Sequence, residues 1–103
     1  MLIGISLMIL IIGLIFKKFP PKKINSIYGY RTNSSMKNKK VWDYAQVVGA
    51  NSFIVLGLIY GILGGLFYLL DFEQYIVEMT IFIIGFIIMI MYDEKIIREF
   101  DKE

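Results

Sequence analysis

Cysteine and histidine are both absent from this 103-residue chain. Without cysteine there can be no disulfide framework, and without either residue zinc, haem and iron–sulfur sites lack their usual ligands. Nucleophilic catalysis through a cysteine or a Ser–His pair is excluded for the same reason. The sequence therefore predicts a protein that holds no metal or cofactor and is not an enzyme.

Charged residues are also scarce, and most of them lie between long apolar runs. The chain is 57% hydrophobic, with a mean hydropathy of +0.66 and a formal net charge of +2. Apolar runs this continuous are typical of membrane proteins, and backbone hydrogen bonding in lipid requires each of them to be helical. We expect an all-α integral membrane protein, one domain over 1–103, with transmembrane helices at about 1–17, 47–70 and 75–92.

The first apolar run is the shortest of the three, since about 20 residues match the hydrocarbon core of a bilayer. Snorkelling lysines and local thinning of the bilayer can make up the difference. A cleaved signal peptide is the competing interpretation. Basic residues follow this run rather than precede it, and no small-x-small cleavage site is visible, so an uncleaved span is favoured.

Basic and acidic residues occupy different connections. Most basic residues lie in segment 18–46 and at the lysine just before it, whereas the connection between the second and third runs is acidic. The positive-inside rule therefore puts the N-terminus outside and both 18–46 and the tail 93–103 in the cytoplasm. The acids could suggest an acid–base or cation site, but a solvated loop with Glu78 snorkelling at the boundary is favoured. The basic residues are Lys17, Lys18, Lys22, Lys23, Arg31, Lys37, Lys39 and Lys40, and the acids are Asp71, Glu73 and Glu78.

The second helix is expected to begin well before its apolar run. Ser34 or Ser35 fits an N-cap, and no helix breaker follows in residues 36–46. A helix from Ser35 to Leu70 would be about 54 Å long, which exceeds a whole bilayer of about 40–45 Å. The helix must therefore project into the cytoplasm or bend, and Gly49–Ser52 is where a bend is expected.

Aromatic and apolar residues also occur outside the predicted spans. Trp42 and Tyr44 are expected at headgroup depth, where amphipathic rings are favoured. In the tail, Ile96, Ile97 and Phe100 share one helical face, which predicts that the third helix continues past the membrane. An interfacial anchor or cap over the cytoplasmic face and a frayed amphipathic end are equally favoured.

The second run holds a helix-packing pattern. Gly57, Gly61 and Gly65 are four residues apart, as two overlapping GxxxG patterns. Small residues at this spacing let another backbone approach closely in lipid. A homo-oligomer interface is one interpretation; the favoured one is that Gly85 of the third run or Gly13 of the first packs there within one chain.

The most distinctive polar stretch is Tyr28-Gly29-Tyr30-Arg31-Thr32, which places a guanidinium between aromatic side chains beside a glycine. Such an arginine can bind phosphate or carboxylate bidentately, or pair with helix carbonyls at the membrane surface. On physical grounds alone the favoured interpretation is that Arg31 and the lysines hold anionic lipid headgroups, at about 1 kcal/mol each.

The same stretch resembles the signature of the SdpI family of bacterial membrane immunity proteins, in which G-x-R-T is followed by Ser, Asn and Trp and then by Ala and Gly leading into the next span. With its flanking spans the resemblance covers residues 1–92, and this chain has only three spans where longer members have more. The matching residues are Pro21, Asn25, Gly29, Arg31, Thr32, Ser35, Asn38, Trp42, Ala45 and Gly49.

The resemblance implies a protein of the bacterial cytoplasmic membrane that protects its host against a membrane-active peptide toxin, by binding the toxin or shielding its target, with no catalytic residue. The alternative is a small non-enzymatic subunit or regulator of a larger membrane complex, docking through the glycine-rich second span and the basic loop. We expect lipid and a peptide as partners and no nucleic acid. The predicted signature or partner-binding residues are Asn25, Tyr28, Gly29, Tyr30, Arg31, Thr32, Ser35, Asn38 and Trp42.

Overall fold

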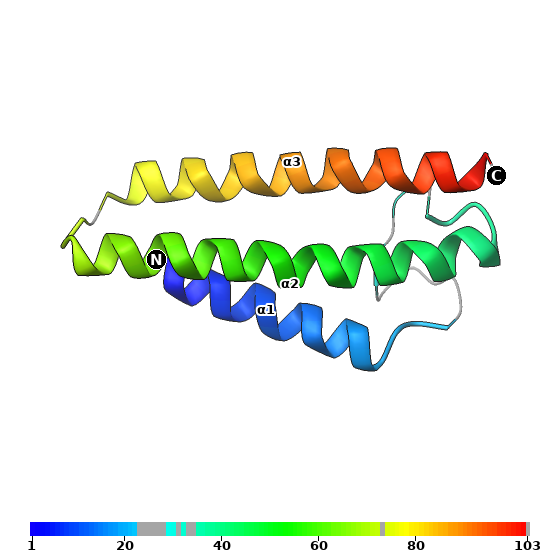
Figure 1. Ribbon diagram of the computed structural model, residues 1–103, viewed down its shortest axis with the longest axis horizontal. Coiled ribbons are helices and arrows are strands. Elements are labelled where there is room, and N and C mark those ends of the chain that lie inside the picture. The colour runs from blue at the N-terminus through cyan, green and yellow to red at the C-terminus, as the bar shows by residue number, and fades with distance from the viewer. Residues whose placement is uncertain (23–28, 31, 33–34, 73, 103) are drawn as a thin grey trace.

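The computed structural model is an antiparallel array of helices with α2 in the middle (Figure 1), and it describes residues 1–22, 29–30, 32, 35–72 and 74–102. The helices are α1 (Leu2–Lys18), α2 (Lys39–Leu69) and α3 (Tyr75–Asp101). The loop after α1 and the C-terminus lie at the same end of the array, and the α2–α3 turn lies at the other (Figure 1). The all-α fold class is confirmed.

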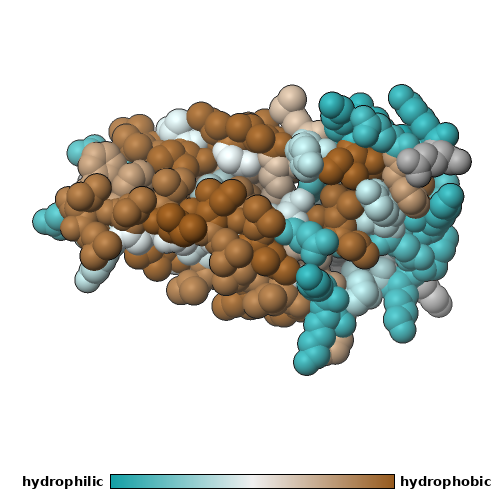
Figure 2. All heavy atoms as spheres, viewed as in Figure 1, coloured by the Kyte–Doolittle hydropathy of each residue, from teal (hydrophilic) through white to brown (hydrophobic). Residues whose placement is uncertain are grey.

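The surface of the helices is apolar over most of its length. Of the described helices, α2 and α3 are long and apolar enough to cross a membrane, whereas α1 has 17 residues. Side chains such as Leu69 and Ile76 are 79% and 83% exposed, and Figure 2 shows apolar residues covering the array up to the polar end formed by the loop and C-terminus. Such exposure suits contact with lipid rather than with water.

The start of α2 differs from the prediction. The helix begins at Lys39, and the N-cap is Asn38, whose side-chain oxygen accepts a hydrogen bond of 2.9 Å from the backbone N–H of Val41. Ser35 does not cap the helix, because its hydroxyl is used in the turn before it; Ser34 lies outside the described residues. The helix therefore does begin well before its apolar run, as predicted, but the predicted serine N-cap is wrong. At 31 residues the helix is about 46 Å long.

No bend interrupts α2 at the expected place, since the helix is continuous through Gly49–Ser52. Its length still exceeds the hydrocarbon core of about 30 Å, so its first turns extend beyond the apolar layer in any membrane-spanning placement.

Close contact between backbones characterises the α1–α2 interface. A Cβ added at Gly57 would lie 3.0 Å from the backbone N of Leu10, and one at Gly64 would lie 2.8 Å from the backbone N of Ile3. From the other side, Gly13 of α1 is equally close to α2. Glycines on both helices thus let the two backbones touch within one chain.

The glycine register differs in part from the predicted one. Gly61 does lie along the interface, with an added Cβ 3.5 Å from the Ser6 hydroxyl, but an added Cβ at Gly65 has nothing within 4 Å. At about 100° per residue, Gly64 lies only about 20° around the helix from Gly57, whereas Gly65 lies about 80° away. Gly64, which the GxxxG pattern omits, is therefore the third glycine of this interface.

The α2–α3 interface depends on large side chains. Tyr60 of α2 is 1% exposed, and its hydroxyl donates a hydrogen bond of 2.6 Å to the backbone carbonyl of Phe82 on α3. The same hydroxyl lies against Gly85, where any side chain would collide with it. Gly85 thus receives Tyr60 within the chain and does not pack on the glycine face of α2.

The C-terminal part of α3 packs on the first turns of α2. Ile97 is fully buried beside Val41, and the rings of Phe100 and Tyr44 stack with centroids 4.0 Å apart and an interplanar angle of 9°. The tail therefore caps the start of α2 as part of a continuous helix rather than fraying.

The α2–α3 turn lies at the opposite end, where Asp71 has a positive φ of 57°. Glu78, in the first turn of α3, is only 5% exposed, and its Oε1 lies 3.7 Å from the amino group of Met1. This differs from the expected snorkelling position; Glu73 lies outside the described residues.

Candidate functional site

The described signature residues gather around the start of α2. Asn25, Tyr28 and Arg31 lie outside the described residues. The remaining ones, which we name the signature cluster, are Gly29, Tyr30, Thr32, Ser35, Asn38 and Trp42.

Trp42 attaches the segment after α1 to α2. Its side chain is fully buried, and its Nε1–H donates a hydrogen bond of 2.8 Å to the backbone carbonyl of Pro21. Sequence reasoning expected an interfacial ring at headgroup depth, but this ring is covered by the protein itself. Its polar edge is satisfied by a carbonyl of the loop, as a buried indole requires.

Gly29 occupies a backbone conformation and a space that exclude other residues. Its φ is +105°, and an added Cβ would lie 2.6 Å from both the Gln46 side-chain oxygen and the Pro21 ring. Glycine is favoured here because it alone adopts this conformation without cost and leaves room for those neighbours.

Gln46 holds the backbone of Tyr30 from both sides. The Tyr30 N–H donates to Gln46 Oε1 at 2.7 Å, and Gln46 Nε2 donates to the Tyr30 carbonyl at 2.9 Å. This buried amide thereby satisfies an irregular backbone segment that no helix or sheet completes. Sequence reasoning missed Gln46; a polar amide one helical turn after Trp42, directly before an apolar run, was the available signal.

Thr32 and Ser35 close a compact turn within the cluster. The Thr32 N–H donates to Ser35 Oγ at 2.7 Å, and the Ser35 N–H donates to Thr32 Oγ1 at 3.2 Å. The Ser35 hydroxyl also lies 2.9 Å from the Tyr30 carbonyl oxygen, which it can reach as a donor. The two hydroxyls thus tie Thr32 to Ser35, which lies three residues before the N-cap of α2.

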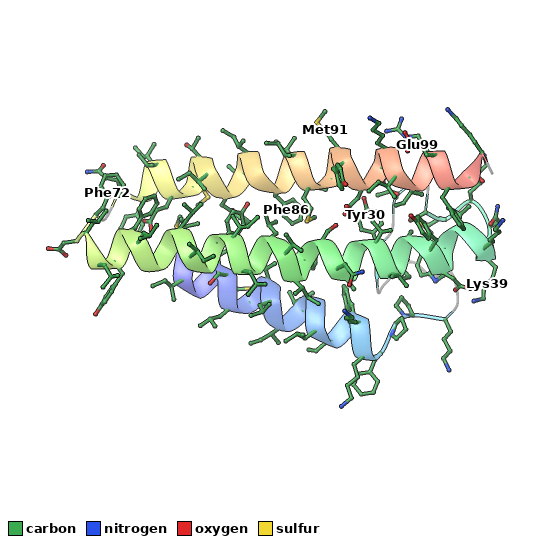
Figure 3. All side chains as sticks on the ribbon, viewed as in Figure 1. Tyr30, Lys39, Phe72, Phe86, Met91 and Glu99 are labelled. Atoms are coloured by element: carbon green, nitrogen blue, oxygen red, sulfur yellow. The ribbon has the colours of Figure 1, made fainter. Side chains whose placement is uncertain are left out.

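Tyr30 joins the loop to both long helices, and Figure 3 shows it between α2 and α3. Its ring lies against Gly49, where an added Cβ would be 2.8 Å from Cδ2, and its hydroxyl donates a hydrogen bond of 3.1 Å to Glu94 Oε1. Burial raises the pKa of the Tyr30 phenol, and the nearby carboxylates of Glu94 and Asp93 raise it further. The phenol therefore stays protonated and remains a donor.

A buried carboxyl lies next to this junction. Asp93 is fully buried, and its Oδ1 accepts a hydrogen bond of 2.5 Å from the Ser52 hydroxyl of α2. Its Oδ2 has no hydrogen-bond partner among the described residues. Sequence reasoning missed Asp93 because it assigned this residue to the tail; an acid directly after an apolar run was the available signal.

Asp93 also lines a groove of about 470 Å³ between α2 and α3. A smaller cavity of about 170 Å³ lies beside Tyr30 and Gln46. Within the described residues there is no group of three or more His, Cys, Asp or Glu side chains that could hold a metal ion. Among the described residues, the arrangement offers mainly apolar walls, one acid and a hydrogen-bonded pair of hydroxyl residues, Thr32 and Ser35.

Comparison with known proteins gives a consistent result. The model of the SdpI/YfhL protein family matches residues 22–92. A protein of Bacillus subtilis (strain 168), named uncharacterized protein YfhL, is 39% identical over 94 residues, covering 91% of this chain and 82% of that relative. No solved structure matches the chain. With its two long apolar helices and this family match, the chain is a membrane protein that belongs to the SdpI/YfhL family.

Proposed function

We propose that this chain protects its cell against a membrane-active peptide toxin, as a non-catalytic protein of the bacterial cytoplasmic membrane. α1, α2 and α3 would each span the membrane, with the N-terminus outside and the signature cluster and tail in the cytoplasm. Family membership and the signature motif support this proposal. The observation that carries it is that the hydrogen-bonded signature cluster lies beside a groove whose lining includes the buried Asp93.

A binding mechanism suits the chemistry of the cluster better than catalysis. The polar groups of Tyr30, Gln46, Thr32 and Ser35 bond to one another, so they hold a shape and present no paired nucleophile and base. Protection would then come from holding the peptide or shielding its target in the membrane.

The alternative, a subunit that docks on a larger complex through the glycine face of α2, is less well supported. Gly57, Gly61 and Gly64 already face α1 of the same chain. A partner helix on that face would have to displace α1.

Expression in a sensitive strain tests the proposal directly. Cells that make the protein should survive challenge with membrane-active peptides encoded near its gene, while cells with an empty vector die. Arg31→Ala should abolish protection without lowering the amount of protein in the membrane, and Lys22→Ala, which also removes a loop charge, should keep it. Failure to protect against every neighbouring peptide would contradict the proposal.

Orientation has a separate test, because the chain has no cysteine that would react in the background. We expect an impermeant maleimide to label Asp71→Cys in intact cells and Lys102→Cys only after lysis. The reverse pattern would overturn the proposed topology.

A further inference from the structure

The groove between α2 and α3 is lined mainly by apolar side chains, with one acid among the described residues. Val55, Ile59 and Ile88 are among its lining residues, and Asp93 lies at the end nearer the tail. Val55 and Ile88 are 55% and 60% exposed, so the groove opens on the surface that faces lipid. Within the part of the chain that the structure describes, no lysine or arginine lines it.

The carboxyl in this groove is held but incompletely satisfied. Ser52 donates to one oxygen of Asp93, while the other has no donor among the described residues. A buried carboxylate with one neutral partner is costly, and in an apolar environment the cost is greater. Glu94, the next residue of α3, accepts a hydrogen bond from the Tyr30 hydroxyl.

We propose that this groove binds an apolar, membrane-inserted peptide segment carrying one lysine-type amine, with Asp93 as the acceptor for that amine. The mainly apolar walls fit the body of such a segment, and its single positive charge complements Asp93, the one acid among the described lining residues. The inference rests on the proposed function to the extent that the toxin would be the natural occupant.

Binding of synthetic peptides to the full-length protein in phosphatidylcholine vesicles tests the groove. The probes are two fluorescent leucine–alanine transmembrane peptides that differ only at one inner position, which is lysine in one and norleucine in the other. Energy transfer to a dye on Lys102→Cys reports association, because the chain has no other cysteine. We expect the lysine peptide to bind about tenfold more tightly, as one charge-assisted hydrogen bond in an apolar site allows.

Asp93→Asn, which keeps the shape and the Ser52 acceptor, should remove the preference for lysine. Asp43→Asn, on the exposed surface, is the matched control and should retain it. Equal binding of the two peptides to the unmodified protein would overturn the proposal, as would a preference that survives Asp93→Asn.

A second variant decides the matter if Asp93→Asn does not fold. Ile88→Phe fills the groove from its exposed side and should weaken binding of the lysine peptide about tenfold. Ile87→Phe is its control, since Ile87 is 50% exposed and does not line the groove. Equal effects of the two variants would overturn the proposal.

Loss of the lysine preference in vesicles containing phosphatidylethanolamine would assign the site to a lipid amine instead, and would also overturn the proposal.

The binding site and the protective function can fail separately. If the protein protects cells and Asp93→Asn protects equally well, the groove proposal is wrong and the function stands. If no peptide toxin is neutralised, the preference of the vesicle-bound protein for the lysine peptide still decides the groove.

Discussion

The two faces of α2 are packed by opposite means. Towards α1, Gly57 and Gly64 bring backbones into contact, so the interface is close along its length. Towards α3, the helices are held apart by Tyr60 in the middle and by Tyr44 and Phe100 at one end. Small residues give close backbone contact at the α1–α2 interface, which we call the glycine seam. A few large side chains instead separate α2 from α3 and leave space between them.

That difference explains where a ligand can enter. A seam in which added Cβ atoms would lie about 3 Å from the neighbouring backbone has no room for another molecule. The groove that contains Asp93 lies between these large side chains of the α2–α3 interface. The glycines therefore close the first interface, whereas the second contains the groove for which we propose a ligand.

The largest expected effect comes from breaking the glycine seam. Gly64→Leu should lower the free energy of unfolding by about 3 kcal/mol, because its side chain would collide with the Ile3 backbone. Gly65→Leu, one residue further on, meets open space and should change it by less than about 0.5 kcal/mol. Denaturation with sodium dodecyl sulfate in mixed micelles measures both, and equal losses would contradict the assigned seam.

A smaller effect is expected at the loop that joins α1 to α2. Trp42→Phe should cost about 2 kcal/mol, because it leaves the buried Pro21 carbonyl without its donor and removes part of a fully buried ring. Tyr68→Phe, at a position 75% exposed, is the control and should be nearly neutral in the same denaturation assay. A neutral Trp42→Phe would mean that the loop is not attached through this hydrogen bond.

Tyr60, the large side chain in the middle of the α2–α3 interface, should contribute less to the free energy of unfolding than Trp42. Tyr60→Phe removes one interhelical hydrogen bond, to the Phe82 carbonyl, and should cost about 1 kcal/mol, as such bonds do in membranes. Tyr75→Phe, at a position 67% exposed, provides the comparison. A cost as large as that of Gly64→Leu would show that the two faces of α2 do not differ in the way described.

The smallest effect is expected for the ion pair at the polar end. Lys37 Nζ lies 2.6 Å from Asp101 Oδ2, but the lysine side chain is 62% exposed. Lys37→Ala should therefore cost less than about 0.5 kcal/mol, and the cost should vanish in high salt. Denaturation at low and high salt, with Lys39→Ala as the comparison, measures this; a salt-independent loss above 1 kcal/mol would contradict a screened surface pair.

The sequence predicted the helices well, because hydropathy and hydrogen-bonding requirements act locally along the chain. The choice between Gly64 and Gly65 was not predictable in this way. Adjacent glycines differ by about 100° around a helix, and the partner helix selects one of them. The prediction of the N-cap was wrong for a related reason, because the Ser35 hydroxyl accepts a hydrogen bond from Thr32 rather than from the first turn of the helix.

The polar contacts of the site could not be read from the sequence. Tyr30 and Glu94 are 64 residues apart, and Ser52 and Asp93 are 41 apart. Such pairs depend on how the helices align, and local patterns carry no information on that alignment. The motif did identify Gly29 and Trp42, whose roles depend on neighbours that it could not name.

The position of Trp42 has a spectroscopic consequence. It is the only tryptophan of the chain, and it is buried with its indole N–H bound to a backbone carbonyl. The tryptophan emission of the unmodified protein, excited selectively over its tyrosines, therefore comes from the joint between α1 and α2 alone. Opening of that joint would expose the indole to a more polar environment and shift its emission to longer wavelength, so the native protein carries its own optical reporter of the signature cluster.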